Sequence, residues 1–222
     1  MYEIIPGVLE KDWRAIEKKL EIIKSFKTTE SDLIPVHVDI IDGKFASNTT
    51  FLDPLPFKKY SRDLFLELHM MVEDPFQYLE SFAEAGFKRF IAQVECLPEF
   101  EKQAEFVAMT QALGKTGLAI DSPTSLEAIK IPYEKLDCVL IMMVKAGESG
   151  QKFNPQYLEK IRKLRKISPD INIEVDGGMN EETVVLAKNA GANVFAVNSY
   201  IFNASNPRGQ YMLLQNKLKE RG

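Results

Sequence analysis

Short apolar runs alternate with longer amphipathic segments along the 222 residues of this chain. Such runs are typical of buried strands, and the segments between them have the apolar spacing of helices. The runs predict eight strands, at 2–9, 34–41, 64–71, 87–95, 115–120, 137–144, 171–176 and 193–199. No Pro-, Gly- or Ser-rich linker interrupts them, so we predict one domain over residues 1–222. About eight strand–helix units predict a closed (β/α)8 TIM barrel with parallel strands, and a doubly wound open sheet is the alternative.

Helix boundaries are marked by residues that favour helix ends. Asp74 and Asn154 each precede a proline, a pattern that predicts an N-cap followed by the first helical residue. Asn180 opens a third predicted helix, and Glu181 and Glu182 follow it. Gly86 and Gly191 stand where a C-cap glycine is expected.

Charge and composition argue against several classes of partner. The net charge of −4 disfavours nucleic acid, because phosphate backbones select basic surfaces. We see no signal peptide and no apolar run of the roughly 18–20 residues that a membrane span needs, and we expect no membrane partner. Cys96 and Cys138 are far apart in strand-like surroundings, which favours buried free thiols over a disulfide. A cytoplasmic location agrees with free thiols.

Polar residues interrupt three of the predicted strands near their carboxyl ends, where barrel enzymes carry their chemistry. His37 and Asp39 share one face of the second strand, His69 ends the third, and Asp176 ends the seventh. Both histidines of the chain lie at such ends. Taken singly, each histidine is more often a hydrogen-bonded core residue, and an aspartate there is often an N-cap. Jointly, two His and two Asp form a plausible N2O2 site for a divalent transition metal, and a metal or catalytic cluster is favoured.

Several motifs resemble those of ribulose-phosphate 3-epimerases. The similarity extends from residue 4 to residue 207 and keeps the family's order and spacing. The segments that carry it are VHVDIIDGKFASN, ELHMMVEDP, VLIMMVKAGESGQKFNPQYLEKIRKLR and IEVDGGMNEETVVLAKNAGANVFAVNSYIF. The resemblance implies a (β/α)8 barrel that binds one divalent metal ion, usually zinc, iron(II), manganese or cobalt.

The reaction implied by this resemblance is a metal-dependent interconversion of D-ribulose 5-phosphate and D-xylulose 5-phosphate through an enediolate. By resemblance, Asp39 and Asp176 are the two catalytic carboxylates, and they bind the metal together with His37 and His69. The partner is then a small sugar phosphate. Relatives often associate, so the resemblance also implies a homo-oligomer.

Substrate-contacting positions follow from the same resemblance and include several departures from the family. Met71 and Met142 match pocket positions, Ile41 takes a third, and Glu10 replaces a substrate-contacting serine. The predicted phosphate-binding residues are Gly147, Ser149, Gly150, Gly177, Gly178, Asn198 and Ser199. Within these motifs, Glu148 and Asn198 stand where the family has Phe and Gly, and Gln93 stands where it often has His.

These departures leave two alternatives open. The enzyme would act on another ketose or ketose phosphate, such as allulose 6-phosphate, with the same chemistry. Otherwise, the barrel would bind a metal or a sugar phosphate without turning it over.

Overall fold

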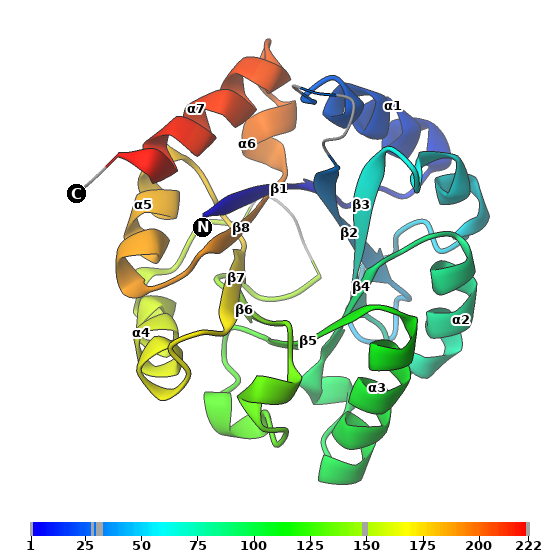
Figure 1. Cartoon of the computed structure of the whole chain (residues 1–222), viewed down its shortest axis with the longest axis vertical. Helices are drawn as coiled ribbons and strands as arrows, with labels where there is room; N and C mark the ends of the chain where they lie inside the picture. Colours follow the sequence, from blue (N-terminus) through cyan, green and yellow to red (C-terminus); the bar gives the residue numbers. More distant parts are fainter. Residues whose placement is uncertain (1, 28, 30–32, 148–150, 221–222) are drawn as a thin grey trace.

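All eight predicted strands form, and they make the inner layer of the molecule (Figure 1). The structure is a computed structural model that describes residues 2–27, 29, 33–147 and 151–220. The strands are β1 (Glu3–Val8), β2 (Ile34–Ile41), β3 (Leu64–Met71), β4 (Arg89–Gln93), β5 (Lys115–Ile120), β6 (Cys138–Met142), β7 (Asn172–Asp176) and β8 (Val194–Val197).

The sheet closes on itself, because β1 pairs with both β2 and β8 and every neighbouring pair is parallel. Ile4 lies opposite Phe195 in the closing pair, and Gly7 lies opposite His37 on the other side. The (β/α)8 prediction is therefore confirmed, and an open doubly wound sheet is excluded. All strand carboxyl ends point to one rim, where chemistry is expected in such barrels.

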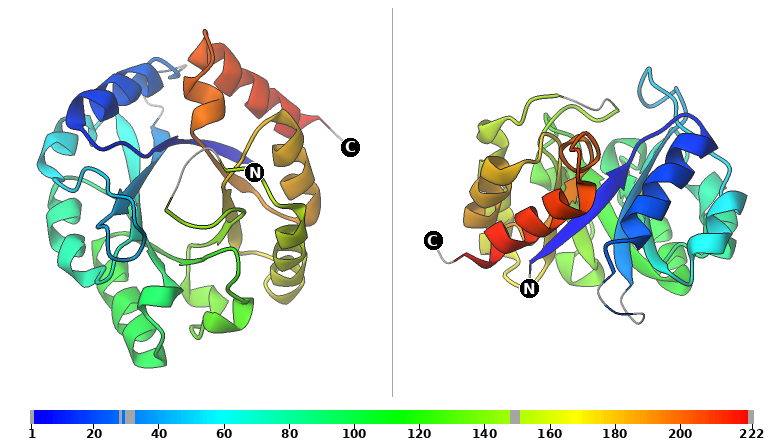
Figure 2. Two further views of the ribbon diagram at one scale, coloured as in Figure 1. Left: turned by 180° about the vertical axis from the view of Figure 1, so that it is seen from behind. Right: turned by 90° about the horizontal axis from the view of Figure 1, so that it is seen from above.

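Helices cover the outside of the barrel, and the right-hand view in Figure 2 shows α1 and α7 on either side of β1. The α-helices are α1 (Trp13–Lys24), α2 (Phe76–Glu84), α3 (Phe100–Leu113), α4 (Leu158–Ile167), α5 (Glu181–Ala190), α6 (Ser199–Phe202) and α7 (Pro207–Lys219). The 3-10 turns are η1 (Leu55–Tyr60), η2 (Val94–Cys96), η3 (Leu126–Ala128), η4 (Tyr133–Lys135) and η5 (Pro155–Tyr157).

Two of the eight units depart from the predicted repeat. The connections over residues 42–63 and 121–137, which the structure describes throughout, contain 3-10 turns and no α-helix. Both carry two prolines, at positions 54 and 56 and at 123 and 132. Pro54 and Pro56 lie at the start of η1, and Pro132 lies at the start of η4, which are positions where proline is tolerated.

The predicted caps are mostly confirmed. Asn180 Oδ1 accepts hydrogen bonds from the backbone N–H groups of Glu182 and Thr183 at 2.9 and 3.0 Å, and Gly191 ends α5 with φ +118°. Asn154 caps η5, the 3-10 turn that leads into α4. The α2 helix begins at Phe76, one residue later than Asp74-Pro75 predicts, although Asp74 still accepts from the Phe76 N–H at 3.1 Å.

Apolar side chains pack in two places, between the strands and helices and inside the barrel. The inner cluster lies beneath the rim and consists of Ile41, Met71, Ile91, Ala119, Cys138, Leu140, Met142 and Ala146. Cys138 is buried and Cys96 only partly so, and both are free thiols. Within the described residues, no helix is both long and apolar enough to span a membrane.

Gly117 and Cys138 form a small–large pair inside the barrel, opposite one another on β5 and β6. A Cβ atom on Gly117 would lie 2.6 Å from Cys138 Sγ and 3.1 Å from Ile91 Cγ1. We expect Gly117→Ala to lower the free energy of unfolding by about 1–3 kcal/mol through overpacking, measured by urea unfolding. Gly117→Ala/Cys138→Ala should be more stable than Gly117→Ala alone. Undiminished stability of the single variant would contradict this packing.

Candidate metal centre and active site

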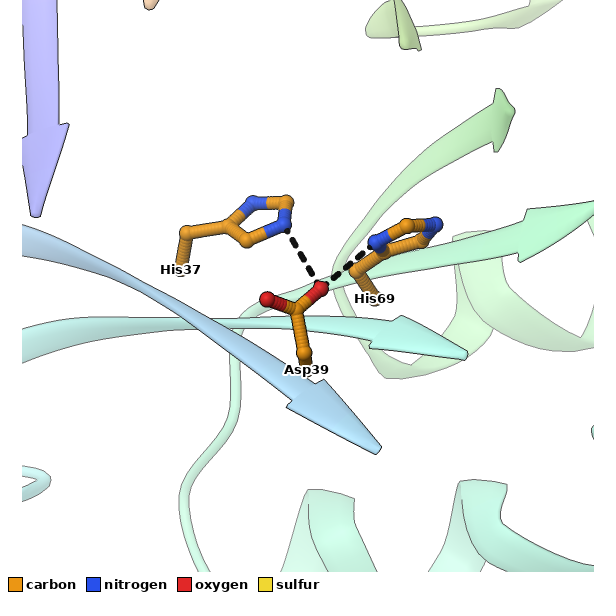
Figure 3. Close-up of side chains that lie close together, drawn as sticks. All are labelled: His37, Asp39 and His69. Atoms are coloured by element: carbon orange, nitrogen blue, oxygen red, sulfur yellow. Dashed lines mark hydrogen bonds and ion pairs between the residues drawn. The ribbon is translucent and has the colours of Figure 1, made fainter. Parts of the chain in front are cut away.

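Two histidines and an aspartate meet at the carboxyl ends of β2 and β3 (Figure 3). Asp39 Oδ1 lies 2.8 Å from His69 Nδ1 and 3.2 Å from His37 Nε2. Ligand atoms of these three buried residues all lie within 4.8 Å of one another, so the cluster could hold a metal ion. The two-residue repeat of a strand brings His37 and Asp39 to one face, and β2–β3 register sets His69 opposite Asp39.

Next to His37, nearer the amino ends of β3, β4 and β7, lies a second group of buried charges. His37 Nδ1 donates to Glu67 Oε1 at 2.6 Å and lies 3.0 Å from Glu174 Oε1. Arg89 donates to the other oxygen of Glu67, and its Nη1 lies 3.9 Å from Glu174 Oε2. Because a carboxylate only accepts hydrogen bonds, Glu67 fixes the His37 proton on Nδ1 and directs Nε2 toward Asp39.

The two glutamates carry different protonation states. Burial by itself raises the pKa of Glu67, but the Arg89 guanidinium and His37 outweigh it and lower that pKa to about 2. Burial and the charge of Glu67 raise the pKa of Glu174 to about 8. Near neutral pH, Glu67 is therefore ionised beside Arg89, and most Glu174 is protonated.

The carboxylates at the rim are also shifted. Burial opposes ionisation of Asp39, but His37 and His69 outweigh it and hold its pKa well below the usual range. Burial and the nearby Asp39 raise the pKa of Asp176 to about 6. For His37, the neighbouring carboxylates outweigh burial and raise the pKa well above its usual value. The site thus has an excess of negative charge and favours a cation.

The donor set fits a divalent transition metal, since two imidazole nitrogens and a carboxylate oxygen converge on one place. The Gln93 amide lies against the same site. Gln93 Nε2 lies 2.9 Å from His69 Nε2, while Gln93 Oε1 has no hydrogen-bond partner among the described residues. With the amide turned over, Oε1 accepts from His69 Nε2–H, which frees the Nδ1 lone pair for a metal, and Nε2 takes the place without a partner.

Asp176 ends β7 across the rim and is partly exposed. It does not join the three residues whose ligand atoms lie within 4.8 Å of one another. Asp39 and Asp176 nevertheless line the same cavity, of about 50 Å³. The structure therefore brings both predicted catalytic carboxylates to one space, and the fourth place in the predicted ligand set stays a prediction.

Four of the predicted phosphate-binding residues, Gly177, Gly178, Asn198 and Ser199, also line this cavity. Gly177 and Gly178 have φ angles of +112° and +68°, which only glycine adopts readily. Gly147 lies elsewhere on the rim, where its carbonyl accepts from Asn48 Nδ2 at 3.2 Å. Residues 148–150, which include Ser149 and Gly150, lie outside the described residues.

The predicted pocket residues separate into two places. Ile41, Met71 and Met142 pack together in the apolar cluster inside the barrel, beneath the rim. Glu10 follows β1 and forms an ion pair with Lys19 of α1, at 2.5 Å between Oε1 and Nζ. It is not among the residues that line the cavity of Asp39 and Asp176.

The buried triad of Glu67, Arg89 and Glu174 was missed in the sequence. The same two-residue repeat that drew attention to His37 and Asp39 would have found two of its members. Glu67 precedes His69 by two residues, and Glu174 precedes Asp176 by two, so each shares a face with a site residue. Arg89 is likewise on the face of Gln93, four residues away in β4.

Comparison with known proteins identifies the family. Residues 3–202 match the model of the ribulose-phosphate 3 epimerase family. The chain belongs to this family. The ribulose-phosphate 3-epimerase of Schizosaccharomyces pombe is 34% identical over 222 residues, covering 97% of this chain and 93% of that protein. The Bacillus subtilis ribulose-phosphate 3-epimerase is 32% identical over 212 residues, covering 92% of this chain and 94% of its own.

Solved structures share the barrel at lower sequence identity. KGPDC from Streptococcus mutans has a TM-score of 0.71 and 12% identity, covering 99% of this chain and 98% of that chain. The 3-hexulose-6-phosphate synthase from Salmonella typhimurium has a TM-score of 0.69 and 12% identity, covering 98% of both chains. At these identities the likeness concerns the fold alone.

Arg89 compensates the buried charge of Glu67, so we expect Arg89→Met to lower the free energy of unfolding by about 3–5 kcal/mol, measured by urea unfolding. Arg162→Met is the matched control, because Arg162 is half-exposed and pairs with exposed Glu159 within α4. The double variant Glu67→Gln/Arg89→Met should recover part of the loss. Equal stability of Arg89→Met and Arg162→Met would rule out this role of the guanidinium.

Proposed function

We propose that this protein is a metal-dependent 3-epimerase that interconverts D-ribulose 5-phosphate and D-xylulose 5-phosphate. The observation that carries the proposal is a pair of carboxylates, Asp39 and Asp176, lining one cavity at the barrel rim in a chain of this family. The curated relatives of similar length bear the name of that activity.

Epimerisation at C3 needs a proton removed from one face of the substrate and returned to the other. The C3–H bond is weakly acidic, and its electrons pass to the adjacent carbonyl to give a planar enediolate. Asp39, on β2, and Asp176, on β7, enter the cavity from separate strands. One carboxylate takes the proton from C3, and the other delivers a proton to the opposite face. In the reverse reaction the two exchange roles.

His37, Asp39 and His69 would hold the metal ion, with Asp176 as the proposed fourth ligand. When bound, the ion supplies Lewis-acid stabilisation of the negative charge that develops on the substrate oxygens. Glu67 keeps His37 Nε2 turned toward the site, and Gln93 does the same for His69 Nδ1. Zinc, iron(II), manganese and cobalt all suit imidazole and carboxylate ligands.

The phosphate end of the substrate would lie against Gly177, Gly178, Asn198 and Ser199. Backbone N–H groups at such glycine turns bind phosphate in many barrels, because glycine allows the backbone to approach closely. In this proposal Gly147, Ser149 and Gly150 also bind the phosphate, as the family motif implies. The apolar floor of Ile41, Met71 and Met142 keeps water from the enediolate.

A second candidate keeps the chemistry and changes the substrate to another ketose phosphate. The observation in its favour is the polar cluster that Glu10 and Asn198 form with Lys19, where the family motif has a serine and a glycine.

A cytoplasmic location is the further expectation, supported by the free thiols of Cys96 and Cys138.

We expect Asp39→Asn and Asp176→Asn each to lower kcat by at least about a hundredfold, because each removes one of the two proton-transfer groups. Turnover of D-ribulose 5-phosphate with added metal measures this, and Asp170→Asn, at an exposed position, is the control. Deuterium from the solvent should enter C3 in the wild type. Undiminished turnover in both variants, or no deuterium uptake by the wild type, would defeat the proposal.

Gln93 is expected to orient His69 for the metal. Gln93→Leu should weaken Co²⁺ binding about 10–100-fold, because the ring loses the acceptor at Nε2. Competition with a chelator, followed by the visible absorption of Co²⁺, measures this affinity without turnover. Gln93→Glu keeps an acceptor and should stay near wild type. The orientation role fails if Gln93→Leu binds Co²⁺ as tightly as Gln93→Glu.

A further inference from the structure

Lys19 links the two most prominent departures from the family motif. Its ammonium lies 2.5 Å from Glu10 Oε1 and 2.7 Å from Asn198 Oδ1, and it sits over the Phe202 ring at 4.6 Å from the centroid. The Lys19 side chain is only 16% exposed. Residues from α1, the loop after β1 and the turn between β8 and α6 thus meet at one cation.

This contact fixes the direction of the Asn198 amide. An ammonium group only donates hydrogen bonds, so the oxygen of the amide must face Lys19. Nδ2 therefore points away from Lys19, and among the described residues it makes no hydrogen bond. Asn198 lines the cavity that also holds Asp39 and Asp176, whereas Glu10 and Lys19 do not. The two N–H donors of the amide have no partner among the described residues and remain available to an acceptor.

Gly7 makes room for this side chain. A Cβ atom on Gly7 would lie 3.2 Å from Asn198 Cβ, which is tighter than ordinary van der Waals contact. The glycine and the asparagine therefore fit one another across the closing pair of β1 and β8. A side chain at position 198 is accommodated in this chain by the absence of one at position 7.

The charges at this place also depend on Lys19. The Glu10 carboxylate would repel a phosphate dianion nearby, but the Lys19 ammonium neutralises it at 2.5 Å. Without the ammonium, the Glu10 charge would be uncompensated near the cavity, and Asn198 would be free to rotate its donors away. One cation therefore both neutralises the repulsion and holds the donors in place.

We infer that Lys19 is a positioning residue that presents the Asn198 amide donors to the phosphate group of the substrate. The inference rests on the proposed function for the identity of the substrate, a ketose phosphate. A family member with glycine at position 198 offers only a backbone N–H there. This chain offers a side-chain donor whose direction is set from α1.

Binding of inorganic phosphate tests the inference without turnover. Lys19→Met should raise the phosphate dissociation constant measured by calorimetry about tenfold or more, and raise KM for D-ribulose 5-phosphate in parallel with a smaller change in kcat. The matched control is Lys18→Met, at an exposed position of the same helix. Asn198→Ala should show a similar loss, and the double variant less than the product of the two losses.

A merely structural role would affect the metal site as well, so Co²⁺ affinity is measured in the same variants and should not change in Lys19→Met. Glu10→Gln is a second variant for the case in which Lys19→Met does not fold. It removes a negative charge, keeps Lys19, and should tighten phosphate binding several-fold.

The inference is overturned if Lys19→Met binds phosphate like Lys18→Met, if the losses of Lys19→Met and Asn198→Ala multiply, or if Glu10→Gln leaves binding unchanged or weaker. Its failure is distinct from failure of the proposed function. Phosphate binding that depends on Lys19 in a protein without epimerase turnover would uphold the inference and defeat the function. Epimerase turnover with unchanged phosphate binding in Lys19→Met would do the reverse.

Discussion

Compensation of buried negative charge is the constraint on which the rest of this site depends. Glu67 and Glu174 are fully buried, and Asp39 is 7% exposed. A carboxylate in such surroundings must be paired, protonated or bound to a cation. Arg89 pairs with Glu67, a proton is held by Glu174, and the rim carboxylates beside two histidines favour a metal ion. The apolar barrel, the buried arginine and the candidate metal site are thus parts of one electrostatic arrangement.

Local sequence patterns were enough to predict the strands and part of the site. Apolar runs identify strands because both faces of a parallel barrel sheet are buried, and the two-residue repeat brings His37 and Asp39 together. The meeting of Asp39 with His69 followed from strand ends sharing one rim. The α-helices expected over residues 42–63 and 121–137 were wrong, since these connections contain 3-10 turns instead.

Other features depend on tertiary contacts that no local pattern encodes. Lys19 and Asn198 are 179 residues apart, and they meet only because closure of the barrel brings β8 beside β1. Glu10 and Asn198, taken separately, read as unfavourable replacements at a phosphate site. Their expected effect on a phosphate group changes because Lys19, from a helix outside the barrel, lies between them. The effect of each residue that departs from the family motif near the substrate therefore depends on its neighbours.

Asp39 contacts both histidines through the same oxygen atom. Oδ1 lies within reach of His37 and His69, and in Figure 3 both dashed lines end on that oxygen and none on the second. The aspartate also lines the cavity at the rim. Its two oxygens are therefore inequivalent: one is anchored among the nitrogen ligands, and the other keeps a free lone pair. In the proposed mechanism, this asymmetry within a single carboxylate would let Asp39 serve as metal ligand and base together.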